Sequence, residues 1–515
     1  MAIKEAAAGN VEVLGEARAD AVEGGGGRVA GNVLALGTGQ LVTWTASSVL
    51  AIALPHYLGD RQLGQISLAF SITELCGLLA SLGTGTYVTK EVARRGKAAG
   101  GTVATALLLR VPLVLLTIVA ALLASVLLQL DHETRMLLYL FVPYIALSAA
   151  FGIVSGALMG LQIMRPIAVS NAVSKTLLVG CILAAAYFDL GAAGIAVAWD
   201  ISMVAALAVV TVALVREGIP MRAGSRAGAK AVLAGGLPFF VWQSSFLVYA
   251  RIDVILLSIW ASEAVLGWYD AAYRIISIPV FIPVIITAAT FPRLSQLAIA
   301  DMERFRDVAR RSLNFVLLLT VPIAAGLIVL AGDIIDFLGY PSEFEHSIPL
   351  IMILALHIPL VGADMVVGNA LSASSRQRAW ALAAVAAAVL NPALNTVLIA
   401  PTESAFSNGA IGAATATVVT ELFLMMCGLR LLERGTFTVH DLAFAMKCVA
   451  AATLMGALVW AMPAVSLPLR VVAGAGVYLA ASLVLRTVST DDIHFVHSYL
   501  LSRIMPRRTV LGEWP

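Results

Sequence analysis

Apolar residues occur in long runs along most of the chain, and short polar segments separate one run from the next. A helix needs about 20 mostly apolar residues to cross the hydrocarbon of a bilayer. Fourteen runs reach that length: residues 29–57, 63–88, 102–129, 136–161, 166–188, 190–215, 234–260, 264–292, 311–333, 347–372, 378–400, 407–430, 442–462 and 466–487. The pattern therefore predicts an all-α polytopic membrane protein with fourteen transmembrane helices.

The second part of the chain repeats the first. At an offset of 203 positions, Leu54, Tyr57, Leu63, Gly64, Ala69, Phe70 and Ile72 correspond to Leu257, Trp260, Leu266, Gly267, Ala272, Tyr273 and Ile275. A second match, at an offset of 218, relates residues 191–198 to 409–416. Each half holds six helices, so both halves enter the membrane from the same side and the repeat is parallel. Helices thirteen and fourteen lie outside it.

This division predicts the domain organisation. We expect a disordered cytoplasmic tail at 1–28, an N-terminal six-helix bundle at 29–215, a cytoplasmic linker at 216–233, a C-terminal six-helix bundle at 234–432, helices thirteen and fourteen within 442–487, and a cytoplasmic tail at 488–515.

Composition supports the membrane assignment. Hydrophobic residues make up 60% of the chain, charged residues only 12%, and the mean hydropathy is +0.93. A soluble domain has roughly a quarter charged residues. The net charge of +2 implies no nucleic-acid partner, and the four cysteines show no metal-binding spacing. We expect no metal and no cofactor.

The placement of Lys and Arg predicts the orientation. Basic residues concentrate in the linkers 89–101, 216–233 and 293–310, whereas the opposite linkers are short or acidic. Cytoplasmic loops carry the excess of basic residues. The sequence therefore predicts a multi-pass protein of the cell membrane with both termini in the cytoplasm.

Several short motifs follow one another in a characteristic order. They read GTGTYVTKEVAR at 83–94, GLPFF at 236–240, ARIDVILL at 250–257, LGWYDAAYR at 266–274 and FPR at 291–293. Together they resemble the Wzx-type polysaccharide flippases of the multidrug/oligosaccharidyl-lipid/polysaccharide exporter superfamily, over roughly residues 29–487. Drug/cation antiporters of this superfamily typically lack helices thirteen and fourteen. Lipid II flippases share fourteen helices, but their Pro-Asn turn in helix two is replaced here by residues 80–83 (ASLG).

Cationic and polar side chains inside the predicted helices are the substrate-binding candidates. A charge at mid-bilayer costs about 2.5–3.5 kcal/mol on insertion scales, so such residues normally face a cavity or a partner. The candidates are Arg251, Arg274, Lys175, Gln40, Gln243 and Tyr249. For Arg251 and Arg274, substrate contact and structural pairing with Asp253 and Asp270 remain equally open. Arg110, near the cytoplasmic end of its helix, is expected to reach the interface instead.

Carboxylates inside the helices are candidates for ion coupling or for ion pairs. They are Glu74, Asp200, Asp253, Asp270, Asp364 and Glu421. His357 is expected to be a core residue. Lys90 and Arg293 coincide at the 203 offset and indicate a cytoplasmic entrance, with ordinary interfacial charge as the alternative.

The resemblance implies a non-enzymatic transporter. It would flip a polyprenyl-phosphate-linked or pyrophosphate-linked oligosaccharide by rocking one half against the other, for surface polysaccharide biosynthesis. Membrane lipids, a coupling proton or sodium ion, and glycan polymerase or ligase machinery are the expected partners. The alternatives are a drug/cation antiporter of the same superfamily and a membrane glycan polymerase or ligase. A polymerase or ligase would need a large outer loop with catalytic groups, which this sequence does not offer.

Overall fold

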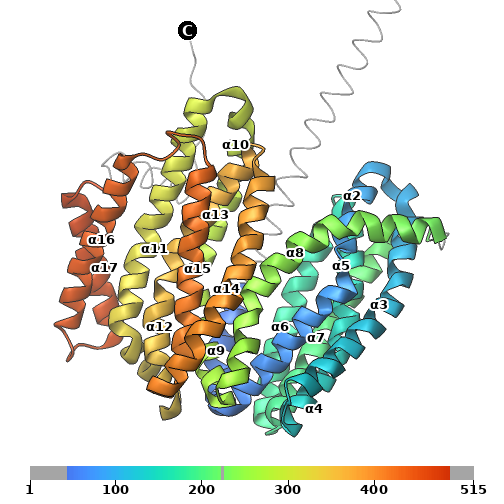
Figure 1. Ribbon diagram of the computed structural model, residues 1–515, viewed down its shortest axis with the longest axis horizontal. Helices are drawn as coiled ribbons and strands as arrows, with labels where there is room; N and C mark the ends of the chain where they lie inside the picture. The colour runs from blue at the N-terminus through green and yellow to red at the C-terminus, as the bar shows by residue number, and fades with distance from the viewer. Residues whose placement is uncertain (1–42, 222–225, 488–515) are drawn as a thin grey trace, which may run out of the picture. The chain divides into compact units, whose positions relative to one another are not determined.

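The computed structural model describes residues 43–221 and 226–487 (Figure 1). A first helical stretch, Thr43–Ser81, precedes the labelled elements. These are α2 (Thr84–Arg95), η1 (Gly96–Ala99), α3 (Gly100–Leu127), α4 (His132–Leu140), α5 (Val142–Gly160), α6 (Arg165–Tyr187), α7 (Gly191–Arg216), α8 (Arg226–Trp260), α9 (Glu263–Ser277), α10 (Phe281–Ala300), α11 (Met302–Leu338), η2 (Ser342–Ser347), α12 (Ile348–Ala355), α13 (His357–Ala373), α14 (Gln377–Phe406), α15 (Ala410–Leu431), α16 (Val439–Trp460) and α17 (Leu467–Val484). The described residues contain no β-strand. The prediction of an all-α membrane protein is confirmed.

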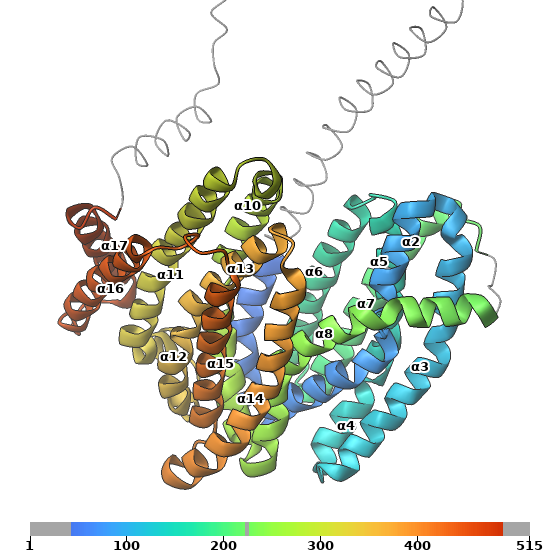
Figure 2. The same cartoon turned by 45° about the horizontal axis from the view of Figure 1, so that its top comes forward.

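Thirteen helical stretches of the described residues are long and apolar enough to cross a membrane. Their number differs from the predicted fourteen because boundaries fall differently. The predicted helices one and two are joined in Thr43–Ser81, where Gly59 has a φ of 68°. Glycine adopts this left-handed conformation with little strain. The stretch Thr43–Ser81, drawn in blue, changes direction along its length (Figure 2).

The described helices form two compact units. The first contains the described residues up to Ile278 together with Ala388–Ala413. Within it, α2, α3, α5 and α7 share one apolar core that includes Val88, Val103, Ile153 and Val210. Helices α5, α6 and α7 run side by side in both views (Figures 1 and 2). Helices α8 and α9, from the second half of the repeat, belong to this unit.

The two halves of the repeat cross at equivalent positions. A Cβ on Gly64 would overlap the backbone of Glu263 and Gly267, and a Cβ on Gly267 would overlap the backbone of Asp60. Gly64 and Gly267 are repeat partners, as are Asp60 and Glu263. Reciprocal contact between equivalent residues is what a two-fold axis through the crossing requires. The two-fold repeat is thus visible in the packing of Thr43–Ser81 against α9.

The motif at residues 83–94 begins at a second close approach between two backbones. Leu82 and Gly83 have φ values of 39° and 65°, which end the first helical stretch before α2 begins. A Cβ on Gly83 would overlap the backbone of Gly236 on α8. Arg110 donates to the carbonyls of Ala80 and Ser81 at this break. The expectation that Arg110 reaches the interface is wrong: its side chain is buried, because it donates to carbonyls at the end of the broken helix.

The second unit contains Pro279–Ala387 and the described residues from Ala414 onward. Here α16 and α17 pack against α11 around Leu330, Met455 and Tyr478. Arg470 Nη1 donates to Asp333 Oδ1 at 2.6 Å, and the Tyr478 hydroxyl donates to the Leu318 carbonyl at 2.9 Å. The two helices outside the repeat are therefore fixed to α11 by polar contacts as well as by apolar packing.

Large apolar side chains cover the outward faces of both units. On α3, Leu115, Leu123 and Val126 are all more than half exposed. Exposed apolar surface on this scale is unfavourable in water but matches a hydrocarbon environment. The protein is a multi-pass membrane protein.

Candidate functional site

A cluster of charged side chains lies inside the first unit, where the first helical stretch faces α8 and α9. Arg251 Nε donates to Glu74 Oε2 at 2.6 Å, and Arg274 Nε donates to Asp270 Oδ2 at 2.5 Å. The Asp270 carboxylate also accepts from the Ser67 hydroxyl, which is its repeat partner. The side chains of Arg251 and Glu74 are 33% and 24% exposed, so the pair is accessible to a ligand.

Lys175 on α6 adds a third cation to this cluster. It lies within electrostatic range of Glu74 and of Arg274. Among residues 43–221 and 226–487, it forms neither an ion pair nor a hydrogen bond. Among these residues, Lys175 therefore has no carboxylate as an ion-pair partner, unlike Arg251 and Arg274.

Aromatic rings back the cluster on one side. The guanidinium of Arg251 lies 5.7 Å from the centroid of the Phe70 ring, a cation–π distance. Phe70 stacks on Trp199 at 5.0 Å and packs edge-on against Phe141 at 5.5 Å. Arg251 is thus held by a carboxylate and by a rigid aromatic platform.

Other residues singled out in the sequence are distributed around this cluster. Asp253 accepts from the Tyr269 hydroxyl at 2.7 Å and is only 4% exposed, so Glu74 rather than Asp253 is the partner of Arg251. Gln243 on α8 donates to the Thr86 hydroxyl at 3.4 Å. Asp200 on α7 lies near Tyr144.

Three further substrate-binding or entrance candidates lie elsewhere on the described helices, and a fourth is not described. Tyr249 lies on α8 and is partly buried. Lys90 and Arg293 are exposed on α2 and α10. Gln40 lies outside the described residues, as do the predicted tails 1–28 and 488–515.

A second polar cluster lies at the connections between α3 and α4 and between α8 and α9. Arg61 Nε donates to Glu263 Oε2 at 2.9 Å. The buried Gln65 amide donates to Asp131, Glu133 and Glu263 at 2.9 to 3.2 Å. The Asp60 carboxylate accepts from the indole of Trp268 at 2.9 Å. These contacts surround the Gly64–Gly267 crossing and hold it closed.

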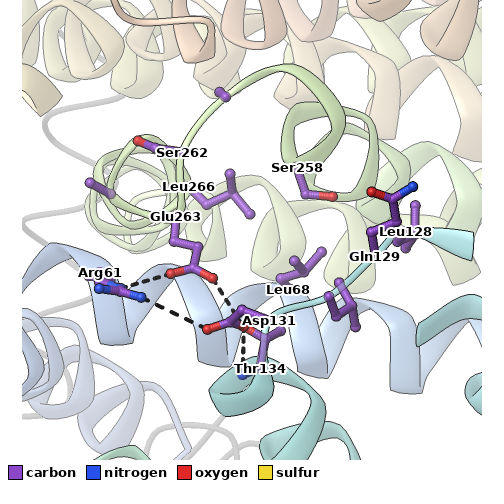
Figure 3. A pocket seen from close by; sticks show the side chains of 13 residues that line it. Arg61, Leu68, Leu128, Gln129, Asp131, Thr134, Ser258, Ser262, Glu263 and Leu266 are labelled. Carbon is purple, nitrogen blue, oxygen red and sulfur yellow. Dashed lines mark hydrogen bonds and ion pairs between the residues drawn. The ribbon is translucent and has the colours of Figure 1, made fainter. Parts of the chain in front are cut away.

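This polar cluster borders a pocket of about 520 Å³ (Figure 3). The side chains of Arg61, Asp131 and Glu263 converge on one side of it, and those of Ser258 and Gln129 lie on the other. Burial raises the pKa of Glu263, an effect that its hydrogen bond from Arg61 only partly offsets. Burial alone would also raise the pKa of Asp131, but hydrogen bonds from Thr134 hold it below its ordinary value.

A third cluster is buried in the second unit. Asp364 on α13 lies beside Glu421 on α15, and His357 Nδ1 is 3.8 Å from Glu421 Oε1. All three side chains are less than a tenth exposed. In the part of the chain that the structure describes, no three His, Cys, Asp or Glu side chains are arranged to hold a metal ion.

Sequence reasoning did not single out Arg61, Gln65, Tyr144 or Trp199. The signal for the second polar cluster is present in the repeat, because Gly64 and Gly267 match there and both demand a close backbone approach. No pattern in the sequence indicates the aromatic platform, since its rings come from three separate predicted helices.

Comparison with known proteins agrees with this architecture. Residues 29–298 match the family described as polysaccharide biosynthesis protein, and residues 238–397 match the MatE family. The chain is 28% identical over 173 residues to the probable low-salt glycan biosynthesis flippase Agl15 of Haloferax volcanii, and 29% identical over 111 residues to the probable flippase AglR of the same organism. These matches cover 33% and 21% of this chain, and 35% and 23% of those relatives.

Solved structures show the same fold. The lipid II flippase MurJ in an inward closed conformation matches with a TM-score of 0.71 at 16% identity, over 88% of this chain and 98% of that one. An inward-facing multidrug resistance MATE transporter matches with a TM-score of 0.61 at 14% identity, over 76% and 94%. The family match spans more than half of the chain. The chain therefore belongs to the polysaccharide biosynthesis protein family, within the multidrug/oligosaccharidyl-lipid/polysaccharide exporter superfamily that its sequence motifs predicted.

Proposed function

We propose that this protein flips a lipid-linked oligosaccharide from the cytoplasmic to the outer leaflet of the cell membrane. The observation that carries the proposal is the cluster of Arg251, Arg274 and Lys175 inside the first unit. Intramembrane charges are costly and mark substrate or ion pathways. The flippase relatives agree with this choice, although they match only part of the chain.

The chemistry of the substrate explains why such a cluster is needed. A phosphate loses its hydration when it enters hydrocarbon, and it must be paired and hydrogen-bonded in return. Arginine presents a planar fork of donors that fits phosphate oxygens. Arg251 and Arg274 come from two different helices of the second half, and Glu74 and Asp270 hold them in place until the phosphate arrives.

Transport would follow alternating access. The two repeated halves would rock against each other, and the contacts around Gly64 and Gly267 would open to release the glycan outside. In this scheme both termini lie in the cytoplasm, and the protein performs no catalysis.

The buried group of Asp364, Glu421 and His357 is our candidate for ion coupling. Two adjacent carboxylates in a low-dielectric interior repel each other, so a proton or a sodium ion between them is favoured. Loading and unloading of that ion could be linked to the rocking movement.

Export in living cells tests the proposal. A strain that lacks its own flippase should regain surface glycan when it expresses this protein. Arg251→Ala, Arg274→Ala and Lys175→Ala should each reduce export at least about tenfold, because each removes a charge that the phosphate needs. Asp364→Asn should reduce export in the same assay through loss of coupling.

Ser295→Ala on α10, a half-buried position in the second unit, is the control and should export normally. Protein amount in the membrane is measured for every variant. Unchanged export in all three cation variants would contradict the proposal. Altered drug sensitivity without any change in lipid-linked glycan would favour the antiporter instead.

A further inference from the structure

The charge balance of the cluster is fixed by five side chains. Arg251, Arg274 and Lys175 are cationic, and Glu74 and Asp270 are anionic. Each arginine is neutralised by one carboxylate, so the cluster keeps one positive charge, which belongs to Lys175. Ion pairs can exchange partners when a ligand enters, but the sum of the charges stays the same.

Two further carboxylates lie nearby and do not belong to this balance. Asp253 is almost completely buried against Tyr269. Asp200 lies near Tyr144, and among the described residues it forms no ion pair with any of the three cations. The charged side chains that act electrostatically on Arg251 and Lys175 are among the five named above, and neither Asp253 nor Asp200 is one of them.

A glycan can be joined to its lipid through one phosphate or through two. A phosphodiester carries one negative charge, and a diphosphate diester carries two. The first would bring the cluster to neutrality, whereas the second would leave one uncompensated negative charge in a region of low dielectric constant. Uncompensated charges are costly there because water cannot solvate them.

Resting on the proposed function, we infer that this site selects glycan lipids that are linked through a single phosphate. Lys175 supplies the charge that the phosphate neutralises. Glu74 and Asp270 set the selectivity, because they cancel the two arginines that would otherwise accommodate a second phosphate. Their contacts with Arg251 and Arg274 are direct ion pairs, so the assignment stands on geometry.

Direct binding tests this inference with the full-length purified protein in detergent. The probes are two synthetic lipids with the same polyprenyl chain and the same neutral fluorescent disaccharide, joined by one phosphate or by two. We expect the wild-type protein to bind the monophosphate lipid about tenfold more tightly. Glu74→Gln and Asp270→Asn should each tighten binding of the diphosphate lipid by about tenfold and so remove the preference.

Asp200→Asn is the matched control, since it removes a carboxylate of the same region that pairs with no cation of the cluster. It should keep the wild-type preference. Thermal melting establishes that each variant is folded, and the two test variants on different helices provide independent readings. Equal affinities of the wild-type protein for the two lipids, or an equal shift with Asp200→Asn, would overturn the inference. Failure of the wild-type protein to bind either lipid would overturn the proposed function itself.

Discussion

At the scale of single residues, the ionisable side chains divide into three groups with different surroundings. Arg251, Glu74, Asp270 and Arg274 form accessible ion pairs, whereas Asp364 and Glu421 are buried in the second unit. In the third group, Glu263 and Asp131 lie at the connections between helices and contact Arg61 and Gln65 of the first helical stretch. The carboxylates of this group outnumber its cation, so their protonation decides how firmly this cluster is held.

Glu263 predicts a pH dependence of stability. Burial holds the pKa of its carboxyl above the ordinary value, so the folded protein binds this proton more tightly than the unfolded chain. The stability contributed by the protonated form is therefore lost as the pH rises from below the ordinary pKa through the raised one. We expect the melting temperature of the wild-type protein to fall relative to that of Glu263→Gln between pH 4 and pH 7, measured by thermal melting in detergent.

Glu345→Gln, an exposed acid in η2, is the control for loss of an acidic side chain. The interpretation of Glu263 would be wrong if the two melting curves of wild type and Glu263→Gln kept a constant separation over this pH range.

At the scale of elements, close backbone approaches decide how the helices cross. Gly64 and Gly267 allow the first helical stretch to touch α9, and Gly83 and Gly236 allow the start of α2 to touch α8. Arg61, Gln65 and Glu263 then contact one another beside the first crossing. Glycine at these positions is required by space, and at Gly83 also by its positive φ.

Gly64→Ala should destabilise the protein because its Cβ meets the backbone of Glu263, which cannot move as a side chain could. Overpacking of this kind costs about 1–3 kcal/mol, so the melting temperature should drop by several degrees. Gly77→Ala in the same helical stretch is the matched control, because nothing lies within 4 Å of its Cβ. Alanine favours a helix there by about 1 kcal/mol. Equal melting temperatures for the two variants would show that the crossing is looser than described.

The sequence predicted the elements well but not their contacts. Runs of apolar residues located most helices to within a few residues, as for α7 at Gly191–Arg216, because hydrocarbon imposes length and composition directly. The break at Leu82–Gly83 was not predicted, since apolar composition continues through it. The sequence offers Asp253, two positions away, as a partner for Arg251, whereas the structure pairs Arg251 with Glu74, 177 positions away. Ion pairs between distant segments depend on how the helices pack, which the pattern of apolar residues does not indicate.

At the scale of the whole molecule, the two halves of the repeat share their packing positions but differ in their charged residues. The repeat partners Gly64 and Gly267 are alike, but Ser67 corresponds to Asp270 and Ser71 to Arg274. The second half thus adds charges to positions that are neutral in the first. Phe70, Glu74 and Ser67 of the first half then contact these charges. In the proposed function, the two-fold framework allows the movement and the asymmetric charges bind the anion.

The most direct test of the account is lipid movement across a reconstituted membrane. Purified protein is placed in vesicles that contain a glycan lipid with a fluorescent label on the sugar, and a membrane-impermeant reductant bleaches only labels in the outer leaflet. We predict that wild-type protein exposes the inner-leaflet lipids to bleaching, whereas the Arg251→Ala/Arg274→Ala double variant leaves them protected. Inner-leaflet lipids that stay protected with the wild-type protein, or that are exposed equally by the double variant, would contradict the account.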